Sequence, residues 1–445
     1  MTSLADRERL FKALVQRFRF NIHELADDID VFVAFETMNN RGKPLSRLEL
    51  LKNRLIYLST LADGTESERK KVRANINSVW RTVYEELGRN PKESLDDDEF
   101  LRAHWIVFFG YDKDEADPLT RFLLNSHFTT QRLDDKSLTL EHIQKYSDSL
   151  QRSVEIWQRL HFPEDHASIL GEGMTAALLR LKRLGFGVLR PLLLAVLSQT
   201  PLGDSHLRIL HQAERFLLLV RSLTKTKSHA GEPESYRLAH DIHEGSQQLD
   251  DARAMLCERV SRYFSASAFQ VKIDELFIED DGKGFYDLPS LKFLLFEFEE
   301  HLRQVAKAST PKIGWEDFRG ARNSVEHIYP QQPEDHNWPS FQPYDATQRR
   351  FLTHSLGNLV AVSVAKNASL SRRSFNEKKK GTETIPGFSQ GSFSELQVAQ
   401  EVDWTTASIH SRGLEFLRFV ERRWEVSLGD NSSMTKLLKL DFLNG

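Results

Sequence analysis

Apolar residues recur at intervals of three and four residues throughout the middle of the chain, from about residue 66 to residue 310. The pattern is clear in segments such as ERKKVRANINSVWRTVYEEL, GMTAALLRLKRL and HLRILHQAERFLLLVRSL. Side chains at this spacing share one face of an α-helix, whereas a half-buried strand would alternate every two residues. No repeat of fixed length accompanies the pattern, which argues against a solenoid. The sequence therefore predicts a mainly α protein.

The start of the chain interrupts this helical pattern. VFVAF (31–35) is typical of a short strand, and the NNRGKP that follows is typical of a turn. Ser46 should cap a helix over residues 47–59, because Glu49 lies three residues after it and completes a capping box. Within the helical region, loops are expected at residues 224–237 and 278–290.

The pattern changes again after Ser309, where prolines and glycines recur. LVAVSV (359–364) is a strand candidate, and residues 407–427 predict a closing helix. The buried face of that helix should hold five apolar side chains, namely Leu414, Phe416, Leu417, Val420 and Trp424. We therefore expect three parts, residues 1–60, 61–310 and 311–445, with the last boundary near 309–314. The first two are helical and the third is a small α+β domain.

Composition narrows the class of protein. The 445 residues suffice for two to four domains. With a formal net charge of −4, any contact with nucleic acid must come from local basic patches. Cys257 is the only cysteine, which rules out an intrachain disulfide and a cysteine-rich zinc site. No stretch approaches the roughly 20 apolar residues of a membrane-spanning helix, so we expect a cytoplasmic protein without a membrane partner.

Three segments near the C-terminus combine residues that suit phosphodiester hydrolysis. They are SVEHIYPQ (324–331), HSLGNLVAVSVAKNASLS (354–371) and RSFNEKKK (373–380). Hydrolysis needs a base for the attacking water, a divalent ion for the phosphoryl oxygens and a group that orients the base. Histidine titrates near neutral pH, and carboxylate and amide oxygens suit a hard ion such as Mg²⁺. Lysines downstream can meet a phosphate.

These segments resemble the HNH domain at the C-terminus of GmrSD-type restriction endonucleases. The matching residues are Glu326-His327-Ile328 with Pro330, Gly357-Asn358-Leu359, Asn367, and Phe375 with Lys378 and Lys379. The resemblance implies a ββα-metal fold in which His327 is the general base. It also implies that Glu326 and Asn367 hold a single Mg²⁺ or Mn²⁺ ion. Asn358 would fix the loop that aims His327, and Lys378 and Lys379 would complete the catalytic set.

A second resemblance covers residues 31–58, VFVAFETMNNRGKPLSRLELLKNRLIYL. This segment is similar to the end of the ParB/sulfiredoxin-like nucleotide-binding domain of the same enzymes. It implies a partial nucleotide site made of Asn39, Arg41, Gly42 and Lys52. The family's Asp-Gly-Gln-Gln-Arg motif does not occur in this sequence. Residues 1–60 would then be the remnant of that domain, and nucleotide binding would require an upstream segment or a protein partner that supplies the rest.

These resemblances imply a DNA endonuclease, as a subunit or fragment of a modification-dependent restriction or antiphage defence system. Its substrate would be double-stranded DNA, modified or unmodified. Two alternatives stay open: a non-catalytic nucleic-acid-binding or regulatory helical scaffold, and an RNA-cleaving HNH toxin. Each motif also has a simpler interpretation when taken alone. His-x-x-Pro can end a strand, Asn367 can cap a helix, and KKK (378–380) can be a solvated surface.

Overall fold

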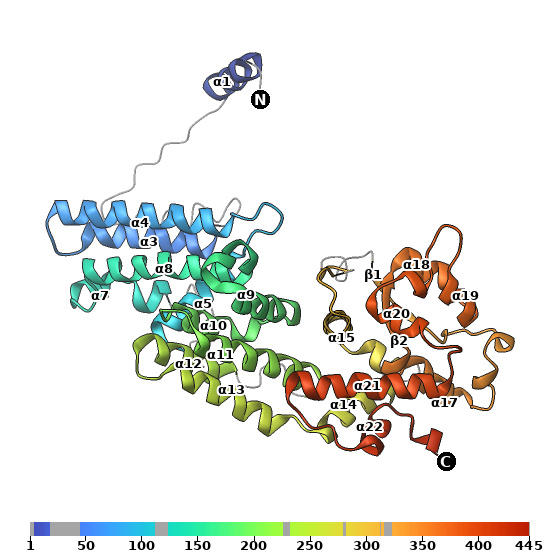
Figure 1. Ribbon diagram of the computed structural model, residues 1–445. Coiled ribbons are helices and arrows are strands. Elements are labelled where there is room, and N and C mark those ends of the chain that lie inside the picture. Colours follow the sequence, from blue (N-terminus) through green and yellow to red (C-terminus); the bar gives the residue numbers. More distant parts are fainter. Residues whose placement is uncertain are drawn as a thin grey trace. The chain divides into compact units, whose positions relative to one another are not determined.

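The computed structural model describes residues 4–17, 45–111, 123–225, 232–278, 282–311, 313–315 and 323–444. Most of these residues are helical, and the described part of the chain contains one sheet of two strands, which confirms the predicted mainly α fold (Figure 1). The chain divides into two compact units, Met1–Arg102 with Asp114–Val154 and Ala103–Lys113 with Glu155–Gly445. The division falls within the helices α5 (Asp97–Phe109) and α8 (Leu140–His161).

The first unit is a helical assembly around α3 (Arg47–Leu61) and α4 (Glu66–Leu87), which pack together. The predicted capping box is confirmed, since Glu49 N donates to Ser46 Oγ (3.3 Å) and Ser46 N donates to Glu49 Oε2 (3.0 Å). Trp80 on α4 is buried and donates from Nε1 to the carbonyl of Leu48 (3.0 Å). The other described helices that lie wholly in this unit are α1 (Leu4–Arg17), η1 (Leu123–His127) and α7 (Thr130–Asp134).

The second unit begins with a stack of helices in which α9 packs on α11, α11 on α13, and α10 on α12. Its longer elements up to residue 305 are α9 (Ala167–Leu184), α10 (Arg190–Ser198), α11 (Asp204–Arg215), the π-helix η4 (Phe216–Ser222), α12 (Glu232–Glu244), α13 (Leu249–Tyr263), α14 (Ala266–Ile278) and α15 (Leu291–Val305). Helix α12 starts at Glu232, so the predicted loop 224–237 is wrong at its C-terminal end. The predicted break at 278–290 is confirmed, because α14 ends at Ile278 and, of the residues described between it and α15, only those of the short η5 (Gly284–Asp287) are helical.

The two strands lie in the C-terminal part of this unit. Strand β1 (Asn323–His327) pairs antiparallel with β2 (Leu359–Ser363), and His327 lies opposite Leu359. Helix α18 (Val364–Leu370) follows β2 directly and packs on both strands, which gives the order strand, strand, helix. The remaining short helices of this part are α17 (Ala346–His354), α19 (Phe375–Lys380), α20 (Phe393–Ala399) and α22 (Asn431–Leu437), with the short turns η6 (Asp335–Asn337), η7 (Pro339–Phe341), η8 (Leu356–Asn358), η9 (Phe388–Gln390) and η10 (Asp441–Asn444).

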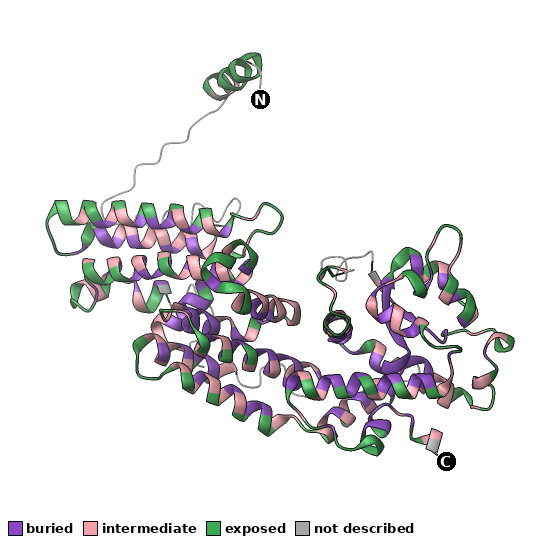
Figure 2. Cartoon of the chain, in the orientation of Figure 1, coloured by how far each residue is buried: buried purple, intermediate pink, exposed green. Residues whose placement is uncertain are grey.

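Helix α21 (Thr406–Trp424) matches the predicted closing helix. Phe416, Leu417, Val420 and Trp424 are buried as predicted, whereas Leu414 is half-buried. Figure 2 shows buried and exposed positions alternating along this helix, as expected for a surface helix with one face on a core. Gly357 of η8 permits the close approach of α21, because a Cβ at this position would lie 2.0 Å from the carbonyl oxygen of Ile409.

Contacts within the second unit connect helices that precede residues 309–314 with elements that follow them. Helix α15 packs against β2 and α20, and Glu299 of α15 accepts hydrogen bonds from the backbone of Phe393 and Ser394 (2.8 and 2.7 Å). Glu214 of α11 is 1% exposed and accepts from Arg423 Nη2 (2.8 Å) and Trp424 Nε1 (2.9 Å). The expected boundary near 309–314 therefore falls inside the second unit, and the three-part division stays a prediction.

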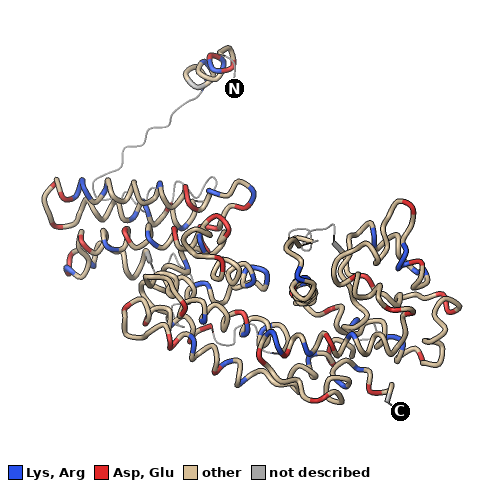
Figure 3. Tube along the Cα trace, viewed as in Figure 1, with Lys and Arg blue, Asp and Glu red and all other residues tan. Residues whose placement is uncertain are grey.

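Charge is distributed along the described elements without a long run of one sign. Figure 3 shows Lys and Arg interspersed with Asp and Glu on most helices, in keeping with the small net charge. Contact with a polyanion would then depend on local groups of cations. None of the described helices is long and apolar enough to cross a lipid bilayer.

Candidate active site

A pocket of about 320 Å³ opens where β1, the turn after it and α18 meet. Its lining includes His327 and Glu326 from β1, Gln331 from the turn, Asn367 from α18 and Arg372 just beyond α18. The strand pairing and the helix that follows β2 thus bring together His327 and Asn367, which are far apart in the sequence. Asn367 Nδ2 donates to Ser324 Oγ (2.5 Å) and to the carbonyl of Val325 (3.3 Å), which fixes α18 against β1.

The imidazole of His327 is held at both nitrogens. Gln331 Nε2 donates to Nδ1 (3.2 Å), so the proton of the neutral ring lies on Nε2, which donates to His354 Nδ1 (3.1 Å). Tyr286 lies against the ring at a centroid distance of 4.7 Å. His354 is the last residue of α17. The sequence pattern predicts no role for it, although it lies four residues before Asn358.

Both histidines are neutral at neutral pH. Burial lowers the pKa of His327 well below its usual value near 6.5, and the neighbouring His354 and Lys378 lower it further. Burial and then Lys283 lower the pKa of His354 to about 4. A neutral His327 has an unprotonated Nδ1 on the side of Gln331, a pocket-lining residue, and can accept a proton there.

Asn358 holds the turn that follows His327. Its side chain is fully buried and makes four hydrogen bonds. The Oδ1 atom accepts from Tyr329 N (2.8 Å) and Trp404 Nε1 (3.1 Å), and Nδ2 donates to the carbonyls of Tyr329 (2.9 Å) and Thr353 (2.8 Å). The backbone carbonyl of Asn358 also accepts from Ile328 N (3.0 Å). Asn358 therefore positions the loop without lining the pocket.

Glu326 and Lys378 form a buried ion pair. Lys378 is 0% exposed, and its Nζ donates to Glu326 Oε1 (2.5 Å) and to the carbonyls of His327 (3.0 Å) and Ile328 (3.1 Å). Burial raises the pKa of Glu326, and the ammonium of Lys378 opposes that shift. All three protons of Lys378 are used inside the protein, so in this arrangement it has none for a phosphate. Lys379 is less buried and donates from Nζ to the carbonyl of Glu401 (2.8 Å).

Two oxygens at the pocket could hold a divalent ion. The Oδ1 of Asn367 and the Oε2 of Glu326 accept no hydrogen bond from the described residues, and both side chains border the pocket. Hard oxygen ligands of this kind suit a hydrated Mg²⁺ that takes its remaining ligands from water and from a substrate phosphate. A closed cage is not available, since no group of three His, Cys, Asp or Glu residues suited to a metal occurs in the part of the chain that the structure describes. The metal ligands stay a prediction.

The expected nucleotide site lies mostly outside the described residues. Asn39, Arg41 and Gly42 belong to residues 18–44, as does the strand expected at 31–35. Lys52 lies half-buried on α3. These assignments also stay predictions.

Residues 271–419 match the family model described as GmrSD restriction endonucleases, C-terminal domain. The matched region starts in α14, includes α15, both strands and α18, and ends within α21. It thus contains every residue of the candidate active site and begins about 40 residues before the boundary expected from the sequence. The resemblance of the C-terminal region is confirmed at the level of this domain. Among curated proteins, none matches the chain.

Proposed function

We propose that the domain shared with restriction endonucleases makes this chain a metal-dependent DNA endonuclease of the HNH type. The observation that carries the proposal is the state of His327. It is neutral and held at Nε2 by His354, and its unprotonated Nδ1, which accepts from the amide of Gln331, lies beside a pocket bordered by Asn367 and Arg372. A nuclease site needs this combination of an oriented base, oxygen ligands and a cation.

In this mechanism, the attacking water takes the place of the Gln331 amide at Nδ1 of His327, and His327 accepts its proton there. His354 and Tyr286 keep the imidazole in one orientation, and Asn358 fixes the backbone that carries it. Arg372 lies on the exposed rim of the pocket and can pair with a non-bridging phosphate oxygen. Positioned proton transfer of this kind contributes about 10²–10⁴ in rate.

Glu326 and Asn367 would hold the divalent ion, Mg²⁺ or Mn²⁺. When bound, the ion supplies electrostatic stabilisation to the phosphoryl and leaving oxygens. Lys378 partly neutralises Glu326, so the free protein should bind the ion weakly, and the substrate phosphate should strengthen binding. We further propose double-stranded DNA as the substrate and a partner or upstream segment that completes the nucleotide site at residues 31–58.

Nicking of a supercoiled plasmid in Mg²⁺ or Mn²⁺, with EDTA as the blank, tests this function. His327→Ala should lower the nicking rate by about 10²–10⁴ while leaving DNA binding and the thermal transition nearly unchanged. His336→Ala is the matched control, since His336 belongs to the same domain and its side chain is 77% exposed. Equal nicking by the His327→Ala variant and the parent would refute the assignment of the base.

The substrate panel separates the alternatives. Unmodified plasmid, plasmid with modified cytosines, and RNA should each be offered under the same conditions. Cleavage of RNA alone would favour the toxin alternative. Binding of DNA without metal-dependent cleavage would favour the non-catalytic scaffold. The Glu326–Lys378 ion pair supports that alternative, because it partly neutralises the carboxylate that would hold the metal ion.

A further inference from the structure

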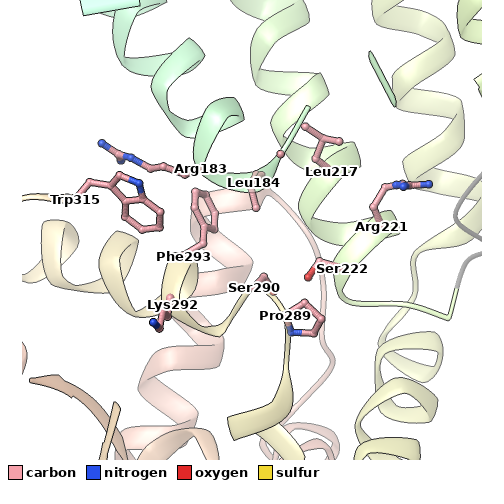
Figure 4. A pocket seen from close by; sticks show the side chains of 11 residues that line it. Arg183, Leu184, Leu217, Arg221, Ser222, Pro289, Ser290, Lys292, Phe293 and Trp315 are labelled. Atoms are coloured by element: carbon pink, nitrogen blue, oxygen red, sulfur yellow. The ribbon is translucent and has the colours of Figure 1, made fainter. Parts of the chain in front are cut away.

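A second cavity, of about 390 Å³, lies away from the proposed nuclease pocket and shares no lining residue with it. It forms where three elements of the second unit end or begin. These are the C-terminal end of α9 with Arg183, the end of η4 with Arg221 and Ser222, and the start of α15 with Ser290 and Lys292 (Figure 4). The aromatic rings of Phe293 and Trp315 form part of the cavity wall, and Figure 4 shows them on the side of Arg183.

The cavity has an excess of positive charge. Arg221 and Lys292 have no carboxylate within ion-pair distance among the described residues. Arg183 is paired with Glu297 (Nη1 to Oε1, 3.3 Å) and lies over the indole of Trp315, 5.2 Å from the ring centroid. The charged and hydroxyl-bearing side chains of the lining are arginine, lysine and serine, and none of the lining side chains is acidic. Such a lining favours an anion.

Four polar atoms that belong to the lining residues are buried without a hydrogen-bond partner among the described residues. They are Arg183 Nε, Arg221 Nη1, Ser222 Oγ and Ser290 Oγ. Ser290 is 6% exposed, so its hydroxyl cannot be satisfied by bulk water at the surface. An unsatisfied buried polar atom is unfavourable, and folded proteins contain few of them. Four such atoms in the residues around one cavity are available to a ligand that accepts hydrogen bonds.

The start of α15 adds backbone donors to the same place. Ser290 is the N-cap of this 15-residue helix, yet its side chain makes no capping hydrogen bond. The first N–H groups of a helix lack internal partners, and the helix dipole places partial positive charge at this end. Lys292 and Phe293, in the first turn, line the cavity. A helix N-terminus with a free cap, next to arginine and lysine, is well suited to a phosphate.

From these observations we propose that this cavity is a binding site for a phosphate ester of nucleotide size. The phosphate would lie at the N-terminus of α15 and accept from the hydroxyls of Ser222 and Ser290, with the flexible side chains of Arg221 and Lys292 on either side of the cavity to balance its charge. The organic part would lie against Phe293 and Trp315. A volume of about 390 Å³ falls within the range of small-molecule pockets and exceeds what a bare phosphate requires. The ester is either a free nucleotide or a nucleotide of a nucleic-acid strand.

Calorimetric titration of the full chain, in the His327→Ala background with EDTA, tests the proposal without any contribution from cleavage. The probes are inorganic phosphate, AMP, ATP, and a short oligonucleotide with and without a terminal phosphate. Arg221→Gln should weaken the binding of the best probe at least about tenfold, and Ser290→Ala about threefold or more. Arg208→Gln on α11 is the matched control, because Arg208 is exposed and does not line the cavity.

Ser290→Ala also separates a binding role from a structural one. Its hydroxyl has no partner, so the variant should unfold at the same temperature as the parent or slightly above it when no ligand is present. Weakened binding of AMP or ATP in this variant would support the proposal with a free nucleotide as the source. Weakened binding of the oligonucleotide alone would support it with a nucleic-acid strand as the source. Binding of no probe, or binding that neither variant changes, would overturn it.

Discussion

Replacing Lys378 by methionine distinguishes two roles for this lysine. The resemblance implies a phosphate contact, whereas the structure surrounds its Nζ with Glu326 Oε1 and two backbone carbonyls. Methionine fills a similar volume but removes the charge and all three donors. Glu326 would then remain buried without a partner.

The expected cost follows from the burial of the pair. Removing one partner of a buried ion pair costs about 3–5 kcal/mol, because the remaining charge is left uncompensated. A protein of ordinary stability has roughly 5–15 kcal/mol to lose, so the change is large. With a urea slope near 3 kcal/mol/M, the midpoint of unfolding should fall by about 1–2 M. The double variant Glu326→Met with Lys378→Met should recover much of this loss, since no charge stays buried.

Urea unfolding followed by circular dichroism measures these differences. Lys380→Met is the matched control, because Lys380 is the exposed neighbour on the same helix and its loss should cost less than about 0.5 kcal/mol. DNA binding is measured in parallel. A Lys378→Met variant with parental stability but weak DNA binding would refute the structural role and restore the phosphate contact.

Three further predictions concern the surroundings of the site and the helical part of the second unit. Asn358→Ala should lower the free energy of unfolding by at least about 3 kcal/mol, because four buried partners lose their hydrogen bonds; parental stability by thermal unfolding would contradict this. Gly357→Ala should impair folding, because the added Cβ would clash with the backbone of Ile409. Gly187→Ala is the control and should be tolerated, because a Cβ at position 187 meets open space. Equal soluble yields of the two variants would contradict the clash. The pKa of His161 is lowered to about 3, chiefly by burial and further by the nearby charges of Arg190 and Lys182. Between pH 6.5 and 3, the unfolded chain therefore binds a proton at this position that the folded chain does not bind. Stability should therefore fall as the pH drops through this window, by at most about 1.4 kcal/mol per pH unit, and a His161→Phe variant with the same pH dependence of unfolding would refute this.

Local features of the fold could be predicted from the sequence because they depend on a few neighbouring residues. The cap at Ser46 needs only Glu49, and the strand at 359–363 follows from a run of apolar residues that includes the β-branched Val360 and Val362. The extent of loop 224–237 is overestimated from the sequence because its polar composition also suits the first turn of α12, where Glu232 and Glu234 complement the helix dipole.

Pairings across the chain could not be predicted in this way. His354 and Lys378 meet residues 27 and 52 positions earlier, and no local pattern specifies such distances. One constraint was available, since neighbours on a strand point to opposite faces and Glu326 directly precedes His327. It already implied that the two side chains have different surroundings, one beside Lys378 and the other beside His354.

The buried carboxylate of Glu214 limits how the C-terminal part of this chain can be exchanged between proteins by recombination during evolution. A recombination that joined residues 311–445 to foreign helices would transfer Arg423 and Trp424 without the acceptor to which both donate. It would also uncover the faces of β2 and α20 on which α15 packs. The exchangeable segment should therefore extend upstream through α11. Among homologous chains, position 214 should covary with position 424, and recombination breakpoints should be rare between them.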